Sequence, residues 1–153
     1  FAGESFELGG ACVDILHPTR EWLATDDGHR TDNANSLVMT VDVNGMRVLL
    51  SGDVEREGLD WLLANVKTDC VVALAPHHGS PASRPQEFCQ WCQPEYVVIS
   101  GGLESVGAAG SQAYELAGAR VLHTADSGAV EFVIGPDGIE VDEYRRVGTY
   151  VAN

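Results

Sequence analysis

The stretch Cys70-Val71-Val72-Ala73-Leu74-Ala75-Pro76-His77-His78-Gly79-Ser80 joins an apolar run to a short polar loop. Six residues rich in valine and bounded by a proline are typical of a buried strand. Side chains on the loop that leaves such a strand lie at an open edge of a sheet, where binding and catalytic residues are common. The imidazoles of His77 and His78 and the hydroxyl of Ser80 are therefore candidate functional groups.

A second apolar run delivers an acidic side chain. The segment Arg47-Val48-Leu49-Leu50-Ser51-Gly52-Asp53 ends in an aspartate after a Ser-Gly pair. Carboxylate and neutral imidazole are ligands for zinc, manganese or iron, and strand ends are rigid enough to fix ligand geometry. Asp53, His77 and His78 are thus candidate metal ligands. One alternative stays open, in which Asp53 caps a helix starting near Glu55 and the histidines are ordinary turn residues.

Length and apolar patterning indicate one domain, residues 1–153, with its own hydrophobic core. No apolar run approaches the roughly 20 residues that span a bilayer, so we expect this piece to be soluble. The chain starts at Phe1 and shows no signal-peptide pattern. We therefore expect it to be a piece of a longer protein.

Charge is strongly asymmetric, with nine basic and 23 acidic residues and a formal net charge of −14. Nucleic-acid affinity normally comes from arginine and lysine that neutralise phosphates, and Lys67 is the only lysine in the chain. The composition argues against a general polyanion-binding surface. A bound metal ion would reverse the sign of the charge locally.

Cysteine spacing suggests burial more than metal binding. Cys89 and Cys92 flank Gln90-Trp91, but no second ligand pair at similar spacing follows to complete a zinc ribbon. Residues three apart share one face of a helix, and free cysteine behaves as a small apolar residue. We expect this face to be buried.

The pattern of the whole chain predicts a mixed α/β class with a sheet covered by about three helices. Asn44-Gly45 predicts a two-residue hairpin turn. Strands are expected at 11–16, 36–43, 46–51, 70–75, 95–100, 119–123, 129–134 and 139–144, and helices after Glu55 to about residue 66, at 85–93 and at 111–117. Residues 25–35 and 126–128 are expected to be a loop and a turn, and the last two strands an antiparallel meander.

Five short segments follow one another in a fixed order along the chain. They are Asn35-Ser36-Leu37-Val38, Leu49-Leu50-Ser51-Gly52-Asp53, Pro76-His77-His78-Gly79-Ser80, residues 94–101 and residues 124–130. In this order they resemble the C-terminal half of the metallo-β-lactamase-like domain of the ComEC family of bacterial competence DNA-uptake channels. The resemblance extends over residues 13–132.

The resemblance implies half of an αββα sandwich whose strand-end loops hold one or two ions of zinc or manganese. Asp53 would be the bridging carboxylate. His77 and His78 would divide the roles of metal ligand and of transition-state or phosphate contact, and Ser80 would hydrogen-bond substrate or orient an imidazole. The partners implied are DNA, the upstream half of the same domain and a channel in the bacterial inner membrane, with this domain extracytoplasmic.

Several family features are absent. The principal ligand motif of the family, His-x-Asp-x-Asp-His, does not occur, since His17 and His29 have no second ligand at the needed spacing. Asn33 and Asn35 stand where the wider superfamily often has a histidine, and residues 102–109 contain no asparagine, tyrosine or histidine. The upstream half of the domain would have to supply the missing ligands.

His123 and Asp126 are left out of the candidate site. A histidine after Val121-Leu122 is more often a hydrogen-bonded residue at a strand end, and Asp126 precedes an ordinary turn.

Three functions remain open at this point. The first is a metal-dependent hydrolase of the phosphodiesterase or nuclease type belonging to a DNA-uptake protein, inactive as this fragment. The second is a degenerate, non-catalytic binding or assembly module of the same protein. The third is half of another small metallohydrolase. Because an unpaired sheet edge and uncovered apolar surface favour pairing, we also expect the fragment to self-associate.

Overall fold

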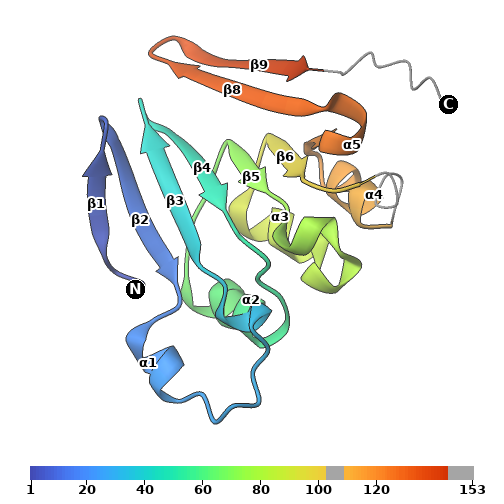
Figure 1. Cartoon of the computed structure of the whole chain (residues 1–153). Coiled ribbons are helices and arrows are strands. Elements are labelled where there is room, and N and C mark those ends of the chain that lie inside the picture. Colours follow the sequence, from blue (N-terminus) through green and yellow to red (C-terminus); the bar gives the residue numbers. More distant parts are fainter. Residues whose placement is uncertain (103–108, 145–153) are drawn as a thin grey trace, which may run out of the picture.

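The computed structural model describes residues 1–102 and 109–144. It is a mixed α/β structure, as the sequence predicts, built on a seven-stranded sheet with a separate two-stranded hairpin (Figure 1). The strands of the large sheet lie side by side in chain order, from β1 to β7. Within the described residues, no helix is both long and apolar enough to cross a membrane.

The first four strands pair antiparallel. Asn44 and Gly45 connect β3 to β4 and both have positive φ angles, which a tight hairpin turn between right-twisted strands requires. The bounds in this half are β1 Ser5–Leu8, β2 Ala11–His17, α1 Arg20–Ala24, η1 Asn33–Asn35, β3 Val38–Val43 and β4 Met46–Leu50.

From β4 onward the strands are parallel, and each connection between them contains a helix. Parallel neighbours joined in the same direction by right-handed crossovers place their helices on the same side of the sheet. The bounds are α2 Arg56–Asn65, β5 Val72–Leu74, η2 Pro76–Gly79, η3 Pro81–Ser83, α3 Pro85–Cys92, β6 Tyr96–Ile99, α4 Ala109–Leu116, β7 Arg120–His123 and α5 Thr124–Ser127.

The hydrophobic core lies between this helix layer and one face of the sheet. Leu49 and Ala73, on neighbouring strands, are fully buried. Leu59 and Leu62 of α2 and Phe88 of α3 belong to the same cluster. The i, i+3 spacing of the two leucines thus buries one stripe of α2 on the sheet, as the sequence predicts.

The opposite face of the sheet is also apolar but less covered. Because side chains alternate along a strand, Val41, Val48 and Tyr96 point away from the helices, and all three are partly exposed. Phe6 of the edge strand β1 is 50% exposed on this side. We call this surface the open face.

The hairpin formed by β8 (Ala129–Gly135) and β9 (Gly138–Tyr144) lies across one end of the open face. Phe132 packs edge-on against Tyr96, with ring centroids 5.7 Å apart. At its far end the Asn44 side chain donates to the Ile134 carbonyl at 3.4 Å. The hairpin thus begins a second layer at the amino ends of the parallel strands (Figure 1).

The expected strands and helices are all present, with shifted ends, but the described residues contain nine strands and five α-helices instead of about eight and three. The additions are β1, α1 and α5, all of four or five residues. The turn expected at 126–128 is one helical turn, because His123 Nδ1 accepts the Ala125 N–H and caps α5. Residues 103–108, between the strand expected at 95–100 and the helix expected at 111–117, lie outside the described residues.

Candidate functional site at the carboxyl ends of β4, β5 and β6

Three parallel strands bring the predicted site together. Asp53 follows β4, His77 and His78 follow β5, and Ser100 follows β6. The loops are joined by hydrogen bonds, from Ser51 Oγ to Leu74 O at 2.7 Å and from the His77 N–H to Gly52 O at 3.2 Å. Ligands in open α/β sheets bind outside the carboxyl ends of parallel strands, which is where these side chains lie.

The loop that carries the histidines has an unusual backbone. His77 has φ 46° and ψ 51°, and His78 has φ 55° and ψ 30°. Two successive side-chain-bearing residues in the left-handed region cost of order 1–2 kcal/mol each, so the surrounding structure must hold them. Gly79 permits this packing, since a Cβ there would lie 3.1 Å from Ile99.

His78 has a defined tautomer. Its Nδ1 lies 2.6 Å from the Ser100 carbonyl oxygen. A carbonyl only accepts hydrogen bonds, so Nδ1 carries the hydrogen and, in the neutral ring, Nε2 presents a lone pair. Nε2 faces Asp53 Oδ1 at 3.6 Å. Two electron-pair donors therefore face each other in a half-exposed position.

Two such donors match the spacing of metal ligands. Zinc bonds to histidine nitrogen and carboxylate oxygen at about 2.0–2.2 Å, which places neighbouring ligand atoms of a tetrahedron about 3.4 Å apart. The observed 3.6 Å between Asp53 and His78 fits this value. Within residues 1–102 and 109–144, however, no three His, Cys, Asp or Glu side chains are grouped so as to hold an ion. Asp53 and His78 would supply two ligands of a larger set.

His77 has a different partner, Glu55, which the sequence did not identify as a site residue. Glu55 Oε2 accepts from His77 Nδ1 at 2.8 Å, and Glu55 Oε1 accepts from Asn33 Nδ2 at 3.2 Å. Burial alone would raise the pKa of Glu55, but these two hydrogen bonds together with the charges of His77 and Arg56 outweigh it and the pKa is lowered. Glu55 is therefore a carboxylate that fixes the His77 ring and leaves Nε2 available.

The helix-cap alternative for Asp53 is wrong. Glu55 occupies the N-cap position of α2, with extended backbone at φ −147° and no side-chain cap, and the helix begins at Arg56. Asp53 lies two residues earlier in the loop, with its side chain 46% exposed and directed at His78. Asp53 therefore does not cap the start of α2.

Ser80 participates in the loop itself. Its Oγ accepts from the Ala82 N–H at 3.2 Å, which caps η3, and its backbone N–H donates to His77 O at 3.0 Å. The hydroxyl hydrogen remains available for another acceptor.

The other polar residues weighed in the sequence lie elsewhere. His17 is fully buried between the Trp22 and Trp61 rings, and His29 is exposed. His123 caps α5, as expected for a hydrogen-bonded residue at a strand end. Asn35 accepts from Trp22 Nε1, 2.7 Å away, and does not reach the histidines through any observed contact. Most of residues 102–109 lie outside the described part of the chain.

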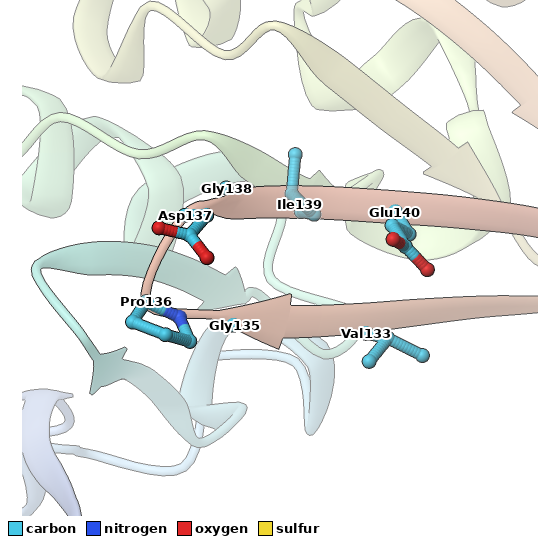
Figure 2. Close-up of a pocket in the computed structure, with 7 residues that line it drawn as sticks. All are labelled: Val133, Gly135, Pro136, Asp137, Gly138, Ile139 and Glu140. Atoms are coloured by element: carbon cyan, nitrogen blue, oxygen red, sulfur yellow. The ribbon is translucent and has the colours of Figure 1, made fainter.

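A hollow of about 270 Å³ lies far from this site, around the β8–β9 turn (Figure 2). Asp137 at the turn and Glu140 on β9 are the charged residues among those that line it. These two carboxylates have no histidine or basic residue beside them in the lining, so the hollow offers no chemistry comparable with the histidine loop.

Comparison with known proteins shows that this chain is similar to parts of much longer proteins. No protein-family model matches the sequence. ComE operon protein 3 of Bacillus subtilis (strain 168) is 40% identical over 73 residues, 46% of this chain and 9% of the relative. Competence protein ComA of Neisseria gonorrhoeae is 29% identical over 150 residues, 94% of this chain and 21% of the relative.

Recombination protein 2 of Haemophilus influenzae (strain ATCC 51907 / DSM 11121 / KW20 / Rd) is 31% identical over 101 residues, 66% of this chain and 12% of the relative. The chain thus spans between 9% and 21% of the length of these relatives. They link it to bacterial competence proteins.

Proposed function

We propose that this chain is the C-terminal part of a metal-dependent phosphodiesterase or nuclease domain, of metallo-β-lactamase type, in a competence protein that takes up DNA. The main support for this proposal is that Asp53 Oδ1 and His78 Nε2 face each other at 3.6 Å. The Ser100 carbonyl sets the His78 tautomer that leaves the Nε2 lone pair free. The competence relatives and the order of the Ser-Gly-Asp and His-His-Gly-Ser segments support the same function.

The geometry supports different roles for the two histidines. His78 presents its Nε2 lone pair beside Asp53, so these two would hold the metal. Glu55 fixes the Nδ1 hydrogen of His77. His77 Nε2 would then take up a proton and donate it to a phosphate oxygen in the transition state. When bound, zinc or manganese makes a coordinated water a nucleophile and neutralises phosphate charge.

The acidity of the chain is compatible with a DNA substrate only near such an ion. With a net charge of −14, most of the surface repels phosphates. Several of the basic side chains are paired with carboxylates, as Arg47 is with Asp42 and Asp69 at 2.9 Å. Binding would therefore be confined to the metal and its immediate surroundings.

The missing ligands would come from upstream sequence that packs on the open face. Sheets pack face to face through apolar side chains, and Val41, Val48 and Tyr96 provide such a surface. The β8–β9 hairpin already starts a second layer there. We therefore place the upstream half of the sandwich beside this hairpin.

The test uses the protein extended upstream of Phe1, with DNA as substrate and manganese or zinc supplied. Asp53→Asn and His78→Ala should lose bound metal, measured by atomic emission, together with nearly all nuclease activity. His77→Ala should keep metal and lose rate, because only the substrate contact is removed. Asp142→Asn and His29→Ala, both exposed and outside the site, are matched controls that should change neither quantity.

Two outcomes would contradict the proposal. If all three site variants bind metal and cleave DNA like the parent, the site assignment is wrong. If the extended protein folds yet neither binds metal nor cleaves DNA, the chain belongs to the non-catalytic module instead.

A further inference from the structure

Three of the four cysteines gather at the end of β5 that is opposite to the histidine loop. Cys70 precedes β5, and Cys89 and Cys92 lie in the last turn of α3. All three are buried and carry free thiols, whereas Cys12 is exposed. The sequence predicted burial for the pair on α3, which the structure confirms, but gave no sign that Cys70 would join them.

Cys70 and Cys92 are in direct contact. The Cys70 N–H donates to Cys92 O at 2.9 Å, and the Cys70 thiol lies 3.5 Å from the same oxygen. The Cys92 thiol donates to the Phe88 carbonyl, 3.2 Å away. With standard bond lengths, the backbone hydrogen bond limits the Cα–Cα separation to at most about 6.8 Å, within the range that disulfides span.

The other possible pair is less suited. Cys89 and Cys92 are three residues apart in a helix, which holds their Cβ atoms about 5–6 Å apart. A disulfide needs a Cβ–Cβ separation of about 3.8 Å, so this bond would require α3 to unwind. The Cys70–Cys92 pair needs no such change, because strand and helix already meet there.

We propose that Cys70 and Cys92 are a disulfide site that ties the start of β5 to the end of α3. The bond would close a loop between positions 22 residues apart that contains both histidines of the candidate site. Closing such a loop restricts the unfolded chain and thereby stabilises the folded one. The inference does not depend on the proposed enzymatic activity.

The oxidant would be a disulfide, either a small one such as oxidised glutathione or that of a protein oxidase. The Cys70 thiolate attacks it, breaks its S–S bond, forms a mixed disulfide and releases one thiolate. The Cys92 thiolate then displaces a second thiolate from the mixed disulfide, and the two protons lost by the cysteines are taken up by the released thiolates, which leave as two thiols. Cys70 lines a groove of about 310 Å³ together with Arg47, Asp69 and Gln93, but only 7% of the residue is exposed.

Burial makes the rate of thiol oxidation differ between the folded and the unfolded chain. Interaction with Cys70 and burial raise the pKa of the Cys92 thiol, and burial raises the pKa of Cys89 to about 11. Thiolates are the reacting species, so the folded reduced chain should oxidise slowly. Oxidation during refolding, while the thiols are still exposed, should be much faster.

The experiment uses the 153-residue chain carrying Cys12→Ser, which prevents crosslinks between molecules through the exposed cysteine. The chain is refolded in a mixture of reduced and oxidised glutathione, alkylated and mapped by mass spectrometry. The expected result is a Cys70–Cys92 peptide, retained in Cys89→Ala and lost in Cys70→Ser. The same mixture in concentrated urea should give scrambled pairs.

Thermal unfolding provides a second readout. The oxidised chain should melt roughly 5–10 °C above its reduced form, as expected for a loop of this size in a protein of this length. Mapping that finds Cys89 bonded to Cys92, or three alkylated thiols in the refolded chain, would overturn the inference. These two readouts do not depend on whether Cys70→Ser or Cys89→Ala folds, because they come from the chain with its three buried cysteines intact.

Discussion

On one face of the sheet Leu49 is fully buried under the helix layer, whereas its neighbour Leu50 points to the open face and stays partly exposed. Both faces are apolar, so the difference lies in what covers them and not in composition. The helix face is completed by residues that follow within the chain. Among the residues that the structure describes, β8 and β9 cover the open face at one end only. An apolar surface left in this state indicates further packing.

The largest expected effect separates these two leucines directly. Leu49→Ala should lower the free energy of unfolding by about 3–5 kcal/mol, since it leaves a cavity in a closed core. Leu50→Ala should cost about 1–2 kcal/mol, because its side chain is only partly removed from water. Urea unfolding of both variants of the isolated chain measures the difference.

The same two variants can be compared in the protein extended upstream of Phe1. If the upstream half packs on the open face, the cost of Leu50→Ala should rise toward that of Leu49→Ala. Equal costs for the two variants in the isolated chain would mean that the open face is already as closed as the core.

Self-association tests the open face in a second way. Val48→Lys places a charge in the middle of this face and should shift the isolated chain several-fold toward monomer, because charged side chains are disfavoured at the core of an interface. Leu116→Lys is the matched control, since Leu116 is 81% exposed on α4. Light scattering that shows a monomeric parent chain at high concentration would count against this expectation.

Acid should weaken the helix side of the sheet. His17 is fully buried and its pKa is lowered, chiefly by burial, with the nearby Arg30 acting in the same direction. The unfolded chain therefore takes up a proton near pH 6.5 before the folded chain does. The contribution of neutral His17 to the free energy of unfolding is fully present above this pH. Below it, the free energy of unfolding falls by at most about 1.4 kcal/mol per pH unit.

His29 supplies the comparison for this pH dependence, since it is exposed. Urea unfolding is measured from roughly pH 7.5 to pH 5, which covers the His titration range. The free energy of unfolding of His29→Ala should fall toward acid pH as it does in the parent chain, and that of His17→Gln should fall less. A parent-like slope in His17→Gln would assign the pH dependence to other groups.

The smallest effect concerns the contact between the hairpin and the β3–β4 turn. Asn44→Asp tolerates the positive φ of this turn but removes the donor to the Ile134 carbonyl. The exposed hydrogen bond should be worth less than about 1 kcal/mol. Amide exchange of β8 should nevertheless increase; unchanged exchange would mean that the Phe132–Tyr96 contact alone holds the hairpin.

Local patterns in the sequence predicted the elements that form by local rules. Asn44-Gly45 predicted the β3–β4 hairpin, and Leu59 with Leu62 predicted the buried stripe of α2. The edge strand β1 was missed because it is exposed along its length and pairs with one neighbour only. The sequence of a strand without a buried face shows little alternation of apolar and polar residues.

In the candidate site too, the residues that follow local patterns were predicted, and those that depend on contacts between distant positions were not. The run of strand residues before Asp53 and before His77 identified both loops. Glu55 was not recognised, because its bond to His77 joins positions 22 residues apart and depends on β4 and β5 lying parallel and adjacent. The contact of Cys70 with Cys92 depends in the same way on where α3 ends.

The order of the strands across the sheet is also the order in which they leave the ribosome. Each new strand can join the edge formed by the one before it, so the sheet can grow during synthesis without a gap left for a later strand. Asp53, His77 and His78 are positioned by β4, β5 and β6. A nascent chain could therefore assemble this loop cluster before the C-terminal hairpin has been translated.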